Sequence, residues 1–398
     1  MTKHSNTIFV LQMILMVGIG QMAQTMFVPA LTEISSSLNS DPEAMQGIMA
    51  WYLIPYGLFQ FIYGPLSDRL GRKIPLLSGL VLFFIGAQVA YYANSIEQLY
   101  LGSFIQGAGT AAAGALARSI PRDLYNGKKL LEMNSIVSMA ILFSPLVAPI
   151  IGGYIVGYSS WQDIYLVLSI LSIIVIGVLA LTFPEPLTKE RRNFQPVLQS
   201  YKHVLSNKVF VIFMVSLVAT LSGVAAFEAV AGILYGNTFG LSPLMISVLF
   251  VLPIPGYLLG AYYAAKLTSQ KKVLQLGVFS LGLGALIILV PSLFGHNIVA
   301  TVVLGSVLFF AGAGALFPTL TSLALQPFPK HAGVAGALLG GVQNLLAGMA
   351  TLVMSWIPLQ GQLNIGVFLS FATLVVWGLL MSLEEHHVEM PEGEESLS

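Results

Sequence analysis

The sequence contains no cysteine and few charged residues. None of its 398 residues is Cys, only 9% are Asp, Glu, Lys or Arg, and acidic and basic residues balance at 17 each. The missing Cys excludes disulfides, zinc thiolates and iron–sulfur clusters, and the missing basic excess argues against a nucleic-acid partner. A soluble domain is usually about 25% charged, so the composition excludes a water-soluble enzyme.

Hydrophobic residues, by contrast, are abundant. They make up 56% of the chain, and the mean hydropathy is +0.84. One membrane-spanning helix needs ~20 apolar residues, so twelve would use about 240 and leave no room for a sizeable extramembrane domain. No GxxxxGK[ST] motif is present, which argues against a nucleotide-hydrolysing module. The composition predicts an all-α membrane protein.

Alternating apolar runs and polar breaks predict twelve transmembrane helices. The predicted spans are 8–30, 45–66, 74–93, 97–118, 133–156, 164–183, 209–235, 244–265, 273–293, 298–325, 332–356 and 363–383. All 17 Lys and Arg residues then fall on one side of the membrane. The positive-inside rule makes that side cytoplasmic and places both termini there.

The longest predicted loop divides the helices into two groups of six. We expect an N-terminal half over 1–183, a linker over 184–208, a C-terminal half over 209–383 and an acidic cytoplasmic tail over 384–398. Apolar residues at helical spacing in the linker favour a short amphipathic helix on the cytoplasmic leaflet, although an ordinary solvated linker fits as well. Six plus six helices suggest an internal duplication with pseudo-symmetric halves.

Glu228 is the acidic residue placed inside a predicted span, the seventh. A charged side chain at mid-membrane costs about 2.5–3.5 kcal/mol on insertion scales, so such residues are functional candidates by default. Desolvation lets a carboxylate take up a proton near neutral pH. Glu228 is therefore the candidate proton-coupling residue, with a structural hydrogen bond or a position near outside water as alternatives.

Uncharged polar side chains within the spans are candidates to line a substrate cavity. They are Gln21 and Gln24 in the first helix, Tyr52 and Tyr56 in the second and, as weaker candidates, Gln343 and Asn344 in the eleventh. The two tyrosines are four residues apart and share a helix face. Amides and phenols among apolar neighbours suit varied amphipathic ligands.

The most specific motif is GPLSDRLGRK over residues 64–73, in the loop between the second and third helices. It resembles the loop signature of the major facilitator superfamily, G-x-x-x-D-R-x-G-R-[RK], at every defined position. The matching residues are Gly64, Asp68, Arg69, Gly71, Arg72 and Lys73.

Two further segments resemble the twelve-span drug–proton antiporters of that superfamily. SPLVAPIIGG over 144–153 is similar to their antiporter motif, through Pro145, Pro149, Gly152 and Gly153. ARSIPRDLY over 117–125 is similar to the end of the fourth helix in the Bcr/CflA subfamily. One departure is Ser103, at a position where the family often carries an Arg.

The resemblance implies two pseudo-symmetric six-helix halves that rock about a central site. It implies a latch in which Asp68 faces the start of the eleventh helix, near Ala332 and Gly333, and Arg72 pairs with Asp123. Arg118 and Arg122 would belong to the same latch.

The function implied is proton-coupled efflux of hydrophobic or amphipathic drugs and dyes across a bacterial inner membrane. The expected partners are those compounds, protons and membrane lipid, with no nucleic acid and no cofactor, and the expected state is a monomer. The alternative is a transporter of a small metabolite such as an amino acid. A channel-like or purely structural membrane protein is disfavoured by the loop and antiporter motifs.

Overall fold

A computed structural model describes residues 3–117, 119–187, 198–328 and 332–385, and these form helices without any strand. The first group comprises α1 (Lys3–Thr25), η1 (Val28–Ala30), α2 (Leu31–Ser37), η2 (Pro42–Ala44), α3 (Met45–Leu70), α4 (Lys73–Tyr91), α5 (Ile96–Leu116), α6 (Ser119–Leu124), α7 (Gly127–Tyr158) and α8 (Gln162–Thr182). The second comprises α9 (Leu198–Leu205), α10 (Lys208–Ile233), the π-helical turn η4 (Leu234–Thr238), α11 (Pro243–Val251), α12 (Pro253–Lys266), α13 (Gln270–Leu293), α14 (Val299–Leu325), α15 (Ala332–Met354) and α16 (Leu363–Glu385).

Each of the twelve predicted spans corresponds to one helix or to a helix pair. Two of these spans are single apolar stretches with a local break in the helix near a proline. The helix of the first span ends at Thr25, because Pro29 lacks the N–H that would bond to the Thr25 carbonyl oxygen. The eighth span is divided into α11 and α12 at Pro253, which has no N–H to donate.

Within the described residues, nine helical stretches are long and apolar enough to cross a membrane. The predicted spans outside this group correspond to α3, α5 and the long α7. α3 and α5 carry several Gln, Ser, Thr and Gly residues, which lower their hydropathy. α5 has most of its residues buried, so it lies among the other helices.

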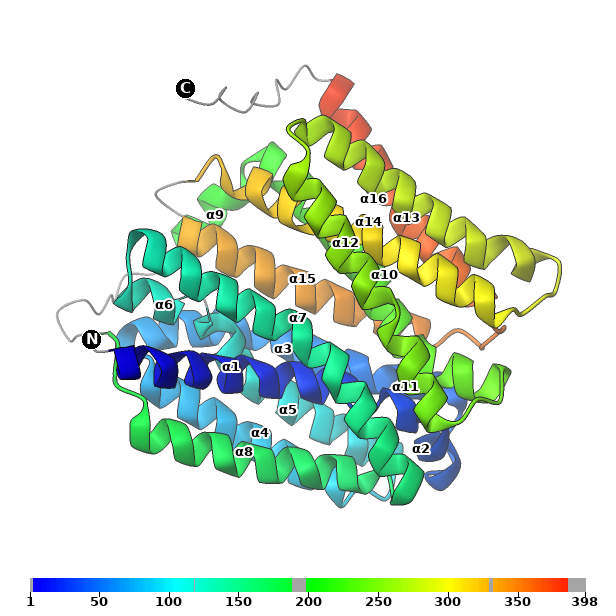
Figure 1. The fold of residues 1–398 in the computed structure, drawn as a ribbon, viewed down its shortest axis with the longest axis horizontal. Helices are drawn as coiled ribbons and strands as arrows, with labels where there is room; N and C mark the ends of the chain where they lie inside the picture. Colours follow the sequence, from blue (N-terminus) through cyan, green and yellow to red (C-terminus); the bar gives the residue numbers. More distant parts are fainter. Residues whose placement is uncertain (1–2, 118, 188–197, 329–331, 386–398) are drawn as a thin grey trace.

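The helices pack mainly within two groups (Figure 1). In the N-terminal group, α5 packs against α3 and α4, α4 against α8, and α1 against α7. In the C-terminal group, α14 packs against α12 and α13, α13 against α16, and α10 against α14, α15 and α16. The groups meet where α3 packs on α15 and α7 packs on α11. We call these groups the two halves.

The linker contains a helix, α9, and one face of this helix packs on the protein. Val204 is fully buried, and α9 packs against α15 and α10. Tyr201 makes an edge contact with Phe61 of α3, and His203 makes one with Phe328, beyond the end of α14. One face of α9 therefore contacts elements from both halves, and its position at the cytoplasmic leaflet stays a prediction.

The α3–α15 contact depends on glycines. A Cβ atom on Gly57 would clash with the backbone of Leu345 and lie 2.6 Å from the carbonyl oxygen of Gly341. A Cβ on Gly348 would lie 2.7 Å from the backbone nitrogen of Ile54. Small residues let membrane helices approach closely enough for dispersion contacts between their backbones. The two halves therefore pack backbone to backbone along this line.

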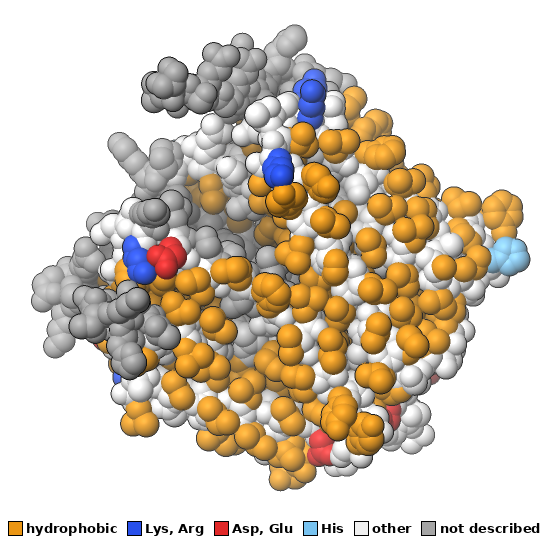
Figure 2. All heavy atoms as spheres, in the orientation of Figure 1, with side chains coloured by type: hydrophobic (Ala, Val, Ile, Leu, Met, Phe, Trp, Pro, Cys, Tyr) orange, Lys and Arg blue, Asp and Glu red, His pale blue; other side chains and the backbone are white. Residues whose placement is uncertain are grey.

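Apolar side chains cover most of the face shown in Figure 2. The large exposed hydrophobics include Leu181, Phe279 and Phe371, on α8, α13 and α16. Exposed apolar area on this scale is typical of a surface in contact with lipid. Together with the apolar helices, it identifies a multi-pass membrane protein.

We expect Gly57→Val to destabilise the protein by about 1–3 kcal/mol, because the added methyls must separate α3 from α15. The measurement is thermal unfolding of the purified protein in detergent. Gly177→Val is the matched control, since a Cβ on Gly177 of α8 meets no atom within 4 Å. Equal melting temperatures for the two variants would contradict the packing argument.

Candidate functional site

The loop between α3 and α4 turns at Gly71, whose φ is +96°. Side chains other than glycine strongly disfavour this left-handed conformation. The turn places Arg72 directly before α4, with its side chain directed back toward the end of α3. The glycine of the motif therefore sets the position of the arginine. Gly64 lies about two turns before Gly71 on α3, and a Cβ atom there would have no neighbour within 4 Å, so close packing does not explain this glycine.

Arg72 is the centre of a buried ion cluster. Its Nε donates to Asp123 Oδ2 at 2.7 Å, and its Nη1 donates to Asp68 Oδ1 at 2.7 Å and to Ser67 Oγ at 2.6 Å. Arg72 is only 6% exposed. Burial alone would lower the pKa of Arg72, but the two carboxylates reverse this and raise it. The expected pair between Arg72 and Asp123 is therefore confirmed.

Glu185 also holds this loop, although no sequence motif pointed to it. Its carboxylate accepts the backbone N–H of Arg72 at 2.8 Å and that of Lys73 at 3.1 Å. These are the first N–H groups of α4, where a helix favours a negative charge. The Nζ of Lys73 donates to the carbonyl oxygen of Ala180 at 2.9 Å, near the end of α8. The loop thus joins the ends of α3, α4, α6 and α8.

Other expected latch residues are not part of this cluster. Arg69 and Arg122 are exposed, and Arg118 lies outside the described residues. Asp68 bonds to Arg72. It was also expected to face the start of α15, which directly follows residues 329–331, and those residues are outside the described ranges. That contact stays a prediction.

The antiporter-motif residues in α7 contact α1 and α11. A Cβ on Gly152 would clash with the carbonyl oxygen of Met26, and one on Gly153 with Oγ of Ser247. Ser247 of α11 donates to the carbonyl oxygen of Pro149 at 2.8 Å. Pro145 lies one turn earlier and is partly exposed.

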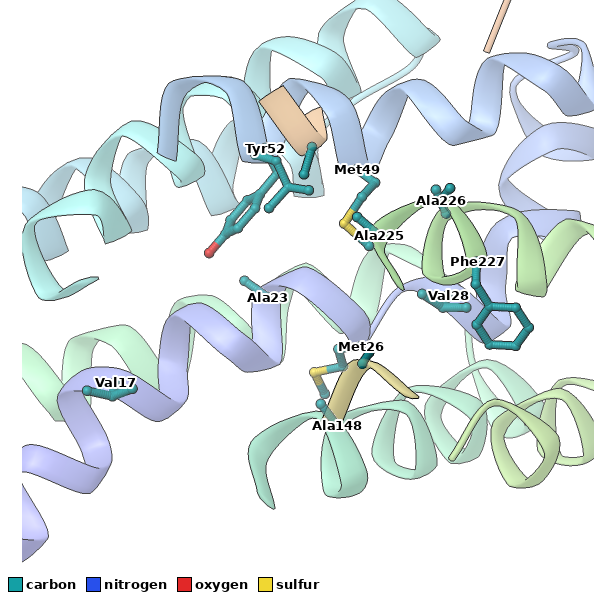
Figure 3. Close-up of a cluster of buried hydrophobic side chains, with 14 of the residues drawn as sticks. Val17, Ala23, Met26, Val28, Met49, Tyr52, Ala148, Ala225, Ala226 and Phe227 are labelled. Carbon is teal, nitrogen blue, oxygen red and sulfur yellow. The ribbon is translucent and has the colours of Figure 1, made fainter. Parts of the chain in front are cut away.

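Glu228 lies where the two halves meet. Gln24 of α1 donates its Nε2 to Oε2 of Glu228 of α10 at 3.2 Å. Both side chains are partly exposed, whereas their neighbours Ala23, Ala226 and Phe227 are buried. Figure 3 shows this buried surrounding, to which α1, α3, α7 and α10 all contribute. The structure therefore brings together two of the predicted functional residues.

The remaining polar candidates have different environments. Tyr52 is 2% exposed, and its hydroxyl bonds to the carbonyl oxygen of Gly20 at 2.8 Å and to Thr110 Oγ1 at 2.9 Å. It ties α1, α3 and α5 together, which differs from the cavity position expected for it. Tyr56 stacks on Tyr52 with ring centroids 6.0 Å apart and is partly exposed.

The environments of the other three candidates, Gln21 on α1 and Gln343 and Asn344 on α15, say less about a cavity. Gln21 is partly exposed. Gln343 is buried, and Asn344 donates to the carbonyl oxygen of Gly340 on its own helix at 2.8 Å. Among the six cavity candidates, Gln24 donates a hydrogen bond to Glu228.

Comparison with known proteins gives consistent results. The family model described as Major Facilitator Superfamily matches residues 13–351. The chain is 38% identical to Multidrug resistance protein D of Escherichia coli K12, covering 94% of this chain and 95% of that one. It is 24% identical to a Bicyclomycin resistance protein homolog of Haemophilus influenzae, covering 89% and 90%. An inward-open structure of the E. coli xylose transporter XylE has the same fold, with a TM-score of 0.71, 18% identity and 98% coverage of each chain.

We expect Arg72→Lys to lower the melting temperature of the purified protein clearly. Lys keeps the charge but cannot reach Asp123, Asp68 and Ser67 together, and each charge-assisted hydrogen bond contributes about 1.5–3 kcal/mol. Arg69→Lys makes the same chemical change at an exposed position and is the control. If both variants unfolded at the wild-type temperature, the cluster would not stabilise the loop.

Proposed function

The chain belongs to the Major Facilitator Superfamily, and we propose that within it the protein is a proton-coupled exporter of hydrophobic and amphipathic compounds. The observation that carries the proposal is the Glu228 carboxylate, held between two membrane-spanning helices from different halves. A carboxylate in this position can bind a proton or attract a cationic compound, so that each excludes the other. Competition for one site is sufficient for exchange.

When the exported compound is uncharged, the exchange moves one net charge and the membrane potential supplies energy for it. When the compound carries one positive charge, the exchange is electroneutral and the pH difference alone drives it. One elementary charge that crosses 100 mV yields about 2.3 kcal/mol. At 1.4 kcal/mol for each factor of ten, this supports a concentration gradient of roughly 40-fold. The proton gradient is thus the proposed energy source, and the mechanism calls for no cofactor.

The polar side chains on α1 and α3 suit substrates that are mostly apolar. Gln21, Gln24 and Tyr56 offer amide and phenol groups at partly exposed positions, and α14 and α15 carry no charged side chain within their described residues. Such a surface can bind varied compounds through stacking and a few adaptable hydrogen bonds. The relative named Multidrug resistance protein D supports this substrate class over a single metabolite.

Alternating access is the proposed mechanism. α7 packs on α11, and from that contact α7 and α12 diverge toward the end that carries the basic residues (Figure 1). At the other end, Glu43 of the N-terminal half accepts the backbone N–H of Leu359 of the C-terminal half at 2.8 Å. We infer that the acidic end is closed in this state and that the loop held by Arg72 acts when the halves rock.

The positive-inside rule supports an orientation with both termini in the cytoplasm of a bacterium and the acidic loops outside. The proposed location is the inner membrane, and the proposed functional unit is the monomer in contact with lipid.

We expect Glu228→Gln to abolish dye accumulation driven by an imposed pH gradient in proteoliposomes, because the amide cannot exchange a proton. Downhill dye movement without a gradient should persist. Glu97→Gln, which neutralises an exposed carboxylate at the start of α5, should transport as wild type does. Gradient-driven uptake by Glu228→Gln equal to the wild type would remove Glu228 from the mechanism, and competition by amino acids but not dyes would favour a metabolite transporter.

A further inference from the structure

α1 and the segment after it meet α10 and η4 in three successive contacts. Gln24 contacts Glu228, Val28 contacts Gly232, and Thr32 contacts Gly236. The partners are separated by the same number of residues in each case, so the two segments run parallel and in register. We call this set of three contacts the α1–α10 seam.

The two glycines let the two segments of the seam pack closely against each other. A Cβ on Gly232 would clash with the carbonyl oxygen of Val28, and a Cβ on Gly236 would clash with Oγ1 of Thr32. Oγ1 of Thr32 is buried and has no hydrogen-bond partner among the described residues. The two outer contacts therefore provide close packing, and the polar bond of the seam is the one from Gln24 to Glu228.

Among the described elements packed on α10, α11, α14, α15 and η1 carry no ionisable group. The other elements in contact with α10, namely α1, α2, α3, α9, α16 and η4, and α10 itself carry the remaining ones. The groups are Lys3, His4, Glu33, Tyr52, Tyr56, Tyr63, Asp68, Arg69, Tyr201, Lys202, His203, Lys208, Tyr235, Glu384 and Glu385. Glu33 bonds to the backbone N–H of Trp161.

We propose that Gln24 makes proton binding by Glu228 depend on whether the α1–α10 seam is closed. This inference rests on the proposed role of Glu228 in coupling and adds the residue that controls it. An amide N–H donated to a carboxylate favours the ionised form. Since Gln24 and Glu228 belong to different halves, the bond lasts only while the seam is closed.

The dependence has the direction that an exporter needs. With the seam closed at the acidic end, Gln24 favours the carboxylate, so Glu228 gives its proton to water on the basic side. When the seam opens, the N–H donor withdraws, and Glu228 takes a proton from water on the acidic side. One proton then moves inward in each cycle, from water to carboxylate and back to water. Gln24 is a positioning residue and never carries the proton.

The test is the protonation of Glu228 as a function of pH, followed by infrared difference spectroscopy of the purified full-length protein. The carboxylic-acid carbonyl band that is missing in Glu228→Gln identifies the residue. Gln24→Met keeps the size of the side chain and removes the donor. We expect it to raise the pH at which half of Glu228 is protonated by about 1 unit, a tenfold change in proton affinity.

Gln12→Met is the matched control on the same helix. Its amide donates to Thr182 Oγ1 at 2.7 Å, within the N-terminal half and away from Glu228. This control should leave the midpoint at the wild-type value, whereas a merely structural role of Gln24 would give equal midpoints for both variants. A midpoint unchanged in Gln24→Met would overturn the inference and leave the proposed function standing. If Glu228→Gln kept every titrating carboxylic-acid band of the wild type, Glu228 would not bind protons and the proposed function itself would fail.

A second variant opens the seam with Gln24 intact. Gly232→Ala places a methyl against the Val28 carbonyl oxygen and should also raise the midpoint, by separating Gln24 from Glu228. Gly223→Ala on the same helix would clash with Phe309 of its own half, so it disturbs packing away from the seam and should leave the midpoint unchanged. Equal midpoints for the two variants would contradict the role of the seam.

Discussion

An ionisable carboxyl group within a membrane span needs a partner, and in this chain the partner comes from the other half of the molecule. Gln24 can reach Glu228 because η1, which follows α1, packs closely on α10, and it does so because Gly232 offers no side chain to the Val28 carbonyl oxygen. The same absence of side chains lets α3 pack on α15 at Gly57. Polar chemistry at the centre therefore depends on backbone packing around it.

The ion cluster around Arg72, at the basic end, also holds a buried ionised group, and here the partners are fully charged. Arg72 is nearly buried, and two carboxylates compensate for its loss of water. Glu185 adds a third carboxylate, bonded to the backbone at the start of α4 rather than to the guanidinium. These contacts stay within the N-terminal half, so the loop can move with that half as one body.

The spans, the loop motif and Glu228 could be predicted from the sequence, because hydropathy, a long defined motif and a lone acid in an apolar run are local signals. The role of Tyr52 could not, since its hydroxyl bonds to Gly20 and Thr110, far away in sequence. Glu185 was missed for the same reason: it is separated from Arg72 by more than a hundred residues. The periodicity of α9 predicted its helix, but an apolar face does not specify whether lipid or protein will cover it.

The packing of α9 makes the two sides of the basic end unequal. On one side, α3 and α15 touch along their length, and α9 covers their ends through Tyr201 and Val204. On the other, α7 and α12 diverge (Figure 1). A rotation that separates the halves breaks the fewest contacts if its axis lies along the α3–α15 contact. The opening is then widest between α7 and α12. A compound dissolved in the surrounding bilayer would then meet the interior first between those two helices.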